Sequence, residues 1–256
     1  MSLQNEHIED PVNSGIVVRL EKVCKSFGNN KVLRDFSMIL EKGQNIVILG
    51  RSGSGKSVLI KCIIGLIKPD SGVIHVLQRN MSGIGLHEMD EVRARVGFLF
   101  QSNALYDSMT VRENLEFPLR RHRRQMQEKE VNLLVEEALA NVGLPHTADM
   151  MPSELSGGMR KRIALARTLI LKPEIILYDE PTTGLDPITA REISDLIVEL
   201  GRKYQTSSII ISHDMNCVKR VAEKIIMLIE GRCYEEGTYE QLRQSGDEAV
   251  RKFFEP

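Results

Sequence analysis

The stretch "GRSGSGKS", residues 50–57, decides the fold of this chain. It follows the apolar run "NIVIL" and leads into "KSVLIKCII", so a glycine-rich loop joins an expected buried strand to an expected helix. Glycine lets a backbone approach a ligand closely, and the free N–H groups at the start of a helix favour phosphate. The pattern therefore predicts an α/β fold with a loop that wraps a triphosphate.

The side chains of this loop indicate a nucleotide bound together with a metal ion. Lys56 is expected to reach the β- and γ-phosphates of the triphosphate, and the Ser57 hydroxyl is expected to be a ligand of Mg²⁺. The residues that we expect to contact the nucleotide here are Gly50, Arg51, Ser52, Gly53, Ser54, Gly55, Lys56, Ser57 and Val58.

Four short apolar runs predict a mostly parallel sheet. The runs "NIVILG", "RVGFLF", "EIILYD" and "SSIIIS" are rich in Ile, Val and Leu, as expected of strands buried on both faces. Before them, "GIVVRLEKVCKSF" and "KVLRDFSMIL" alternate apolar and polar residues around the turn "GNN". This alternation predicts an antiparallel hairpin, and thus an N-terminal β subdomain beside the α/β core.

The chain between "FLFQ" and "EIILYD", about residues 102–171, has helical periodicity, and we expect it to be an inserted helical subdomain. We expect a loose tail over residues 1–15, one main domain over residues 16–245, and a C-terminal tail over residues 246–256. Phe253 and Phe254 suggest that the last tail docks on a neighbouring subunit or partner. A tail that folds back on its own domain is the alternative.

Composition excludes several classes of protein. The 256 residues carry 34 Lys and Arg against 35 Asp and Glu, so there is no basic field for nucleic acid. The four cysteines are far apart, which favours neither a disulfide framework nor a zinc site. The polar N-terminus is not expected to be a secretory signal, and the apolar runs fall short of the roughly 20 residues of a membrane span. Any membrane role is expected to come through a partner.

Polar residues follow three of the predicted strands. Asp179 ends "IILYD", where a carboxylate can hold Mg²⁺, and the adjoining Glu180 can orient and deprotonate an attacking water. His213 follows "SSIIIS" and can donate to the γ-phosphate, while Gln101 follows "VGFLF" and can touch both Mg²⁺ and the water. Alone, the acidic pair or the histidine could be structural. Their position at one expected sheet edge, together with the phosphate loop, favours hydrolysis.

A second stretch, "SELSGGMRKRIALAR" at residues 153–167, also suits an anion. It combines the hydroxyl of Ser156, the bare amides of Gly157 and Gly158, and a cationic helix. The chain therefore carries two phosphate cradles, and one nucleotide bound within one domain does not explain both.

Taken in this order, the motifs resemble those of the ATPase subunit of ATP-binding-cassette (ABC) transporters, over about residues 17–238. "GRSGSGKS" resembles the Walker A loop, Gln101 the Q-loop, "LSGGM" the signature motif and "IILYDE" the Walker B strand. "GLD" resembles the D-loop and His213 the switch histidine. The resemblance further implies that Phe27 stacks on adenine.

The resemblance implies a head-to-tail homodimer, which accounts for the second cradle. Ser156, Gly157 and Gly158 would bind the γ-phosphate held by Lys56 of the other copy, and Asp186 would lie at that interface. Two residues depart from the family pattern. Val58 stands where threonine is common, and Met159 replaces a frequent glutamine, so we expect altered affinity and a working catalytic carboxylate.

Three segments, "MPSELSGGMRKR", "FQSNALYDSMTVRENLEFPL" and "DEPTTGLDPIT", resemble the ATPase of Mla-type systems, which work with MCE-domain proteins in phospholipid trafficking. This resemblance implies membrane permease subunits, a periplasmic MCE lipid-binding protein and a small STAS-domain protein as partners. It also implies a peripheral position on the cytoplasmic face of the bacterial inner membrane. The alternatives are an ABC ATPase for another solute or a soluble, non-transport ABC ATPase.

Overall fold

The computed structural model describes residues 15–123 and 125–254, and its strands form two sheets. The predicted N-terminal tail therefore lies outside the described residues except for Gly15. The strands are β1 (Ile16–Phe27), β2 (Asn30–Glu41), β3 (Asn45–Leu49), β4 (Ser71–Val76), β5 (Arg79–Asn80), β6 (Val96–Leu99), β7 (Ile175–Asp179), β8 (Ser207–Ile211), β9 (Lys224–Ile229) and β10 (Arg232–Gly237).

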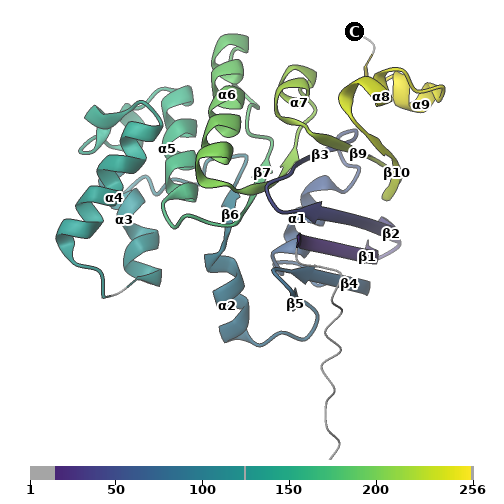
Figure 1. The fold of residues 1–256 in the computed structure, drawn as a ribbon, viewed down its shortest axis with the longest axis horizontal. Coiled ribbons are helices and arrows are strands. Elements are labelled where there is room, and N and C mark those ends of the chain that lie inside the picture. The colour runs from purple at the N-terminus through teal and green to yellow at the C-terminus, as the bar shows by residue number, and fades with distance from the viewer. Residues whose placement is uncertain (1–14, 124, 255–256) are drawn as a thin grey trace, which may run out of the picture.

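Helices cover the larger sheet and extend to one side of it (Figure 1). Two short 3₁₀ turns, Pro145–Thr147 and Pro152–Glu154, precede the fifth α-helix. The α-helices are α1 (Lys56–Ile63), α2 (Leu86–Ala94), α3 (Val111–His122), α4 (Glu128–Asn141), α5 (Gly157–Leu169), α6 (Pro187–Tyr204), α7 (Met215–Val221), α8 (Tyr239–Arg243) and α9 (Glu248–Arg251). Among the helices so described, none combines the length and the apolar character needed to cross a membrane.

The larger sheet has six strands in the order β10-β9-β3-β8-β7-β6, and every pair except β10 with β9 is parallel. Successive residues of its strands point to opposite faces. In β3, Ile46 and Ile48 join the core beneath α1, whereas Val47 and Leu49 join the core shared with α5, α6 and α7. Burial on both faces explains why these strands are continuous apolar runs, and the predicted parallel sheet is confirmed.

The smaller sheet is antiparallel, with the order β2-β1-β4-β5. Its β1 and β2 form the predicted hairpin, which turns where Phe27 pairs with Asn30. Side chains of this sheet and of α1 share one apolar core with the larger sheet. The sheet therefore holds Phe27 next to the phosphate loop, since both line one cavity.

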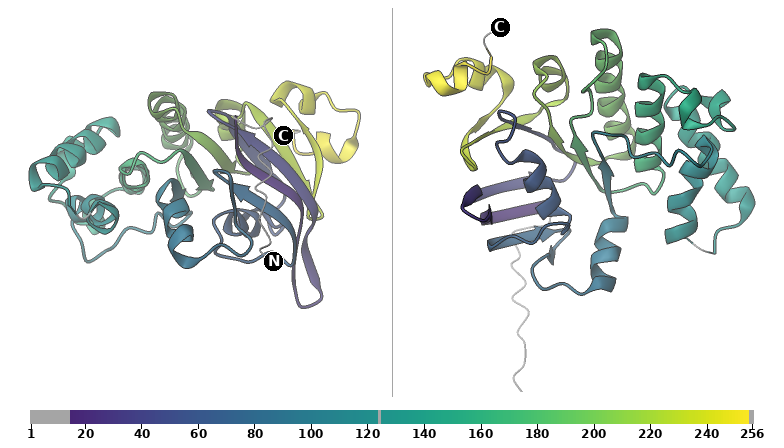
Figure 2. Two further views of the ribbon diagram at one scale, coloured as in Figure 1. Left: turned by 60° about the horizontal axis from the view of Figure 1, so that its bottom comes forward. Right: turned by 180° about the vertical axis from the view of Figure 1, so that it is seen from behind.

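The helices α3, α4 and α5 fall within the range expected for a helical subdomain. Figures 1 and 2 show α3 and α4 at the end of the molecule opposite to β1, β2 and β4, in views that agree with one another. The Thr110 hydroxyl accepts from the Glu113 N–H and starts α3 with a capping box. The helices α3 and α4 thus extend the core on the side of α5.

Asn114 fixes the loop that leads from β6 into α3. Its side chain is fully buried and exchanges hydrogen bonds with the backbone of Tyr106, at 2.8 Å to the N–H and 3.0 Å to the carbonyl. It also donates to the Met109 and Thr110 carbonyls, at 3.1 and 3.0 Å. The side chain thus satisfies the Tyr106 N–H and adds a donor to three loop carbonyls, of which those of Tyr106 and Thr110 also accept from backbone N–H groups.

We expect Asn114→Ala to lower the free energy of unfolding by about 2–4 kcal/mol, because it removes the hydrogen bonds that a fully buried side chain makes to the Tyr106, Met109 and Thr110 backbone. Urea unfolding measures this change. Asn29→Ala is the matched control, since Asn29 is exposed in the β1–β2 turn and its replacement should cost less than about 0.5 kcal/mol. Equal effects of the two substitutions would contradict this account of the loop.

Candidate nucleotide site

The parallel sheet brings the predicted polar residues to one edge. Ile48 pairs with Ile211, and Ile211 pairs with Asp179, so the ends of β3, β8 and β7 lie level with one another. The phosphate loop follows β3, Glu180 follows β7, and His213 follows β8. Gln101 comes shortly after β6, the neighbour of β7. The groups predicted from separate parts of the sequence are therefore assembled at the carboxyl edge of one sheet.

The phosphate loop ends in an uncapped helix. Gly55 at the start of α1 has φ 105°, and Gly53 has φ 77°, conformations that favour glycine. Among the described residues, no side chain caps α1, so its first N–H groups are directed at the cavity in front of the helix. Such a terminus attracts anions through both its hydrogen-bond donors and its dipole.

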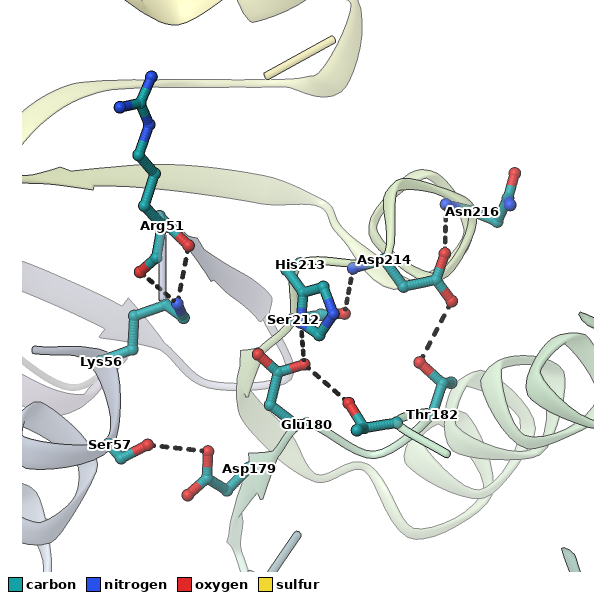
Figure 3. A network of polar contacts seen from close by, with 12 residues as sticks. Arg51, Lys56, Ser57, Asp179, Glu180, Thr182, Ser212, His213, Asp214 and Asn216 are labelled. Atoms are coloured by element: carbon teal, nitrogen blue, oxygen red, sulfur yellow. Dashed lines mark hydrogen bonds and ion pairs between the residues drawn. The ribbon is translucent and has the colours of Figure 1, made fainter. Parts of the chain in front are cut away.

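Lys56 crosses the loop that precedes it. Its Nζ donates to the carbonyls of Gly50 at 2.7 Å and Arg51 at 3.0 Å. Figure 3 shows Lys56 next to Arg51. Burial lowers the pKa of Lys56 from its usual value, while the charges of Glu180 and Asp179 act in the opposite direction. The cation is thus held inside the loop, where phosphate oxygens would replace the backbone carbonyls.

Asp179 and Ser57 join the sheet to the helix. The Ser57 Oγ donates to Asp179 Oδ1 at 3.2 Å, and Asp179 is only 8% exposed. Burial raises the pKa of this carboxyl, although the hydrogen bond from Ser57 opposes the shift. A hydroxyl and a carboxylate side by side, next to a phosphate cradle, are the oxygen donors that Mg²⁺ prefers, so these residues fit the ion.

Two side chains contact the same carboxylate oxygen of Glu180. Its Oε2 lies 2.8 Å from Nδ1 of His213 and accepts from the Thr183 Oγ at 3.2 Å (Figure 3). Its backbone has φ 52°, in the left-handed region, and its N–H donates to the Ile211 carbonyl. Oε2 is occupied, which leaves Oε1 for a water molecule. The His213 side chain is 65% exposed, so its other nitrogen is accessible.

A cavity of about 620 Å³ lies over these residues, a size that suits a cofactor or substrate. Val32, Leu49, Met215 and Phe253 line it without having been predicted. The predicted residues that line it are Phe27, Gly50, Arg51, Ser52, Gly53, Gly55, Lys56, Ser57, Val58, Gln101, Glu180 and His213.

The remaining predicted residues do not line this cavity. Ser54 lies beside Gly50, and Asp179 lies behind Ser57. The other four belong to a second group on α5 and α6, which comprises Ser156, Gly157, Gly158 and Asp186. One chain therefore does not bring the two predicted cradles together.

The second group has an organised geometry of its own. The Ser156 Oγ accepts from the Met159 N–H at 3.2 Å and starts α5. Asp186 starts α6 by accepting from the Ile188 and Thr189 N–H groups, each at 3.0 Å. The Thr189 Oγ also donates to Asp186, at 2.6 Å, and a Cβ at Gly158 would lie 2.6 Å from the Thr189 methyl carbon. Close packing of α5 on Thr189 thus requires glycine at this position.

Lys161 is a site residue that sequence reasoning missed. It is 2% exposed, its Nζ donates to the Gln101 carbonyl at 3.1 Å, and burial lowers its pKa. A sequence signal existed, because Lys161 shares a helix face with Ala164 and Leu165, which are both buried. The contact ties the helix after Ser156 to the loop after β6.

Comparisons with known proteins give this chain a family and several relatives. A family model for ABC transporters matches residues 33–183. The "Probable ribonucleotide transport ATP-binding protein mkl" of Mycobacterium tuberculosis is 38% identical over 93% of this chain, which spans 66% of that relative's length. The "Intermembrane phospholipid transport system ATP-binding protein MlaF" of Haemophilus influenzae is 38% identical over 93% of this chain and 89% of its own.

A solved structure shares the fold. It is a dimeric, post-hydrolysis state of the ATP-binding cassette MJ0796 bound to ADP and Pi. It matches with a TM-score of 0.78 and 32% identity over 86% of this chain and 98% of its own.

Two glycines of the phosphate loop allow a matched test of its packing. A Cβ at Gly55 would lie 2.9 Å from a Val32 methyl carbon and 3.0 Å from the Val32 carbonyl oxygen, whereas a Cβ at Gly53 would meet nothing within 4 Å. Both glycines have positive φ. We expect Gly53→Ala to cost about 1 kcal/mol of unfolding free energy from backbone strain, and Gly55→Ala at least about 1 kcal/mol more from the clash.

Urea unfolding of the two variants in the absence of nucleotide provides this comparison. Equal losses of unfolding free energy would show that Val32 moves aside, and the tight packing of β2 on the loop would be refuted.

Proposed function

Because the chain belongs to the ABC transporter family of ATP-binding proteins, we propose that it binds and hydrolyses ATP to power phospholipid transport through an Mla-type membrane complex. The observation that carries the proposal is the convergence of Lys56, Ser57, Glu180 and His213 on one cavity, with Asp179 behind it. The 38% identity to a phospholipid-transport ATPase supports the choice of cargo.

The site would hold ATP through the loop and the start of α1. The amides of residues 53–58 and the Lys56 ammonium would take the β- and γ-phosphates, and Phe27 would stack on adenine. Ser57, Asp179 and Gln101 would hold Mg²⁺, which neutralises phosphate charge when bound. Arg51, Ser52 and Ser54 would complete the loop around the phosphates.

Glu180 would act as the general base. Its free Oε1 would take a proton from water as the water oxygen bonds to the γ-phosphorus, and the bond to the bridging oxygen of ADP would break. His213 would donate to the γ-phosphate from the nitrogen that does not contact Glu180. The contact at Nδ1 fixes the orientation of the ring, so base and phosphate donor are positioned as one unit.

The second cradle would act on the nucleotide of a second copy. Ser156, Gly157 and Gly158 lie away from the cavity of their own chain, with Asp186 packed next to them through Thr189. A similar cassette forms a dimer bound to ADP and Pi. In a head-to-tail homodimer, the bare amides at the start of α5 would close each nucleotide site from the opposite subunit.

The transport complex would contain permease subunits in the inner membrane, an MCE lipid-binding protein in the periplasm and a STAS-domain protein, with this chain on the cytoplasmic face. Another cargo is the second candidate, since the mycobacterial relative is named a probable ribonucleotide transport ATP-binding protein. Native purification followed by identification of the co-purified membrane subunits tests the choice. Recovery of a permease without an MCE protein, and ATPase activity insensitive to phospholipid, would refute lipid transport.

We expect Glu180→Gln to retain ATP binding and to lose steady-state hydrolysis by about 100-fold or more, because the amide cannot take the proton. Phosphate release by the purified protein measures the rate. Glu199→Gln is the control, since this exposed carboxylate on α6 faces away from the core and its replacement should leave turnover unchanged. Turnover near the parental rate in Glu180→Gln would remove this residue from the role of base.

The proposal that the second cradle binds the nucleotide of a second copy can be tested separately. In a Glu180→Gln background, where hydrolysis should stall, closed dimers should accumulate in the presence of Mg-ATP. We expect Ser156→Arg to abolish these dimers without changing the affinity of the monomer for ATP, because the bulky side chain blocks only the opposite nucleotide. Lys56→Ala should lose both binding and dimers. Light scattering measures the dimers, and titration with a fluorescent nucleotide measures the affinity of the monomer for ATP. If Ser156→Arg abolished ATP binding by the monomer, the cradle would act on the nucleotide of its own chain.

A further inference from the structure

The described part of the C-terminal segment folds back onto its own chain. Leu242 of α8 and Val250 of α9 are fully buried in the main core. The Tyr234 hydroxyl on β10 donates to Asp247 at 2.7 Å, and Asp247 in turn caps α9 by accepting from the Ala249 N–H at 2.7 Å. The segment is thus anchored at both helices, while docking of Phe253 and Phe254 on a neighbouring subunit or partner stays a prediction.

These anchors give the two adjacent phenylalanines different surroundings. Phe254 packs edge-on against Tyr239, with ring centroids 5.4 Å apart. Phe253, by contrast, lines the nucleotide cavity together with Phe27 and the phosphate loop. One phenylalanine holds the segment in place while its neighbour faces the site.

A second cavity places Phe253 beside the phosphate loop. This space, of about 570 Å³, is lined by Phe253 and Lys252 on the segment, by Arg51 and Ser54 of the loop, and by the end of β9. Figure 3 shows the Arg51 side chain extending from the loop away from Lys56 and toward the pale yellow C-terminal ribbon. Phe253 therefore stands between two spaces that meet at Arg51.

We propose that Phe253 contacts the bound nucleotide and forms the C-terminal wall of its site, which rests on the proposed binding of ATP. The ring adds a flat apolar surface to a cavity that Phe27, Val32 and Met215 also line with apolar groups. Aromatic faces stack on nucleobases and cover ribose without sequence-specific hydrogen bonds. Phe27 and Phe253 reach the cavity from opposite ends of the chain.

The proposal has a thermodynamic consequence for residues 238–254. If the packed segment improves nucleotide affinity, the nucleotide must stabilise the packed segment by the same factor, because coupling between two binding events is reciprocal. ATP would thus order the α8–α9 segment, and ATP release would loosen it. The order of the segment would then depend on whether nucleotide is bound, and a molecule in contact with its outer surface would meet a different surface in each state.

The first test is titration of a fluorescent ATP analogue with Mg²⁺. We expect Phe253→Ala to raise the Kd for the nucleotide about tenfold, because one stacked ring is lost. Phe253→Tyr keeps the ring and should restore the parental Kd. Phe117→Ala is the matched control, because Phe117 on α3 packs on Tyr106 and lies outside both cavities. A Kd within twofold of the parental value in Phe253→Ala would overturn the proposal.

Failure of the proposed function gives a different result. If the parental chain binds no nucleotide, or if Lys56→Ala binds as well as the parent, the site itself is wrong, whatever Phe253 does. If the parent binds the nucleotide and Lys56→Ala does not, the comparison of Phe253→Ala with the parent tests the role of Phe253 alone. Mixing Phe253→Ala with an excess of Lys56→Ala then tests the subunit: restored affinity would show that Phe253 acts from a second copy and would overturn the arrangement within one chain.

Trypsin digestion measures the reciprocal effect. Arg251 and Lys252 are exposed next to Phe253, so cleavage there follows loosening of the segment. We expect Mg-ATP to slow this cleavage several-fold in the parent and to have no effect in Phe253→Ala, at nucleotide concentrations that saturate both. Equal protection of the two proteins would contradict the proposal.

Discussion

The parallel pairing of β3, β8 and β7 is the constraint on which the rest of the molecule depends. It sets Ile48, Ile211 and Asp179 at one level, and the chain leaves all three strands in the same direction. The strand pairing therefore brings together the phosphate loop, the carboxylates and the histidine. Contacts between these groups are not needed to place them. The hydrogen bond from Ser57 to Asp179 then locks α1 to β7, and the apolar cores on both faces of the sheet resist any shift of register.

Much of this arrangement could be predicted from sequence because each part leaves a local signature. Apolar runs mark strands buried on both faces, and the glycine-rich loop specifies its own strand–loop–helix context. The strands β4, β5, β9 and β10 were missed as sheet members. Short β5 carries no periodic signal, and "KIIMLI" at residues 224–229 is an apolar run that strand and helix share. Lys161 had a helix-face signal, and Phe253 was predicted to dock on a partner. Their places at the site could not be predicted, since their contacts join segments far apart in the chain.

The two cradles differ in how complete they are within one chain. The first is closed on several sides, by the antiparallel sheet, the phosphate loop and the C-terminal segment. The second is a rigid surface, in which Asp186, Thr189 and Gly158 fix α5 against α6 but leave the amides at the start of α5 facing outward. Lys161 connects this surface to Gln101, so the two halves of the proposed mechanism share a mechanical link inside each subunit.

The backbone of Glu180 imposes a trade-off between stability and activity. A residue with a side chain at φ 52° costs about 1–2 kcal/mol relative to an ordinary conformation. Glycine would relieve this strain, and asparagine would tolerate it, yet both would remove the carboxylate that His213 and Thr183 hold. A search for heat-resistant variants of this protein would therefore tend to select replacements at position 180 that fold better and lack the proposed general base.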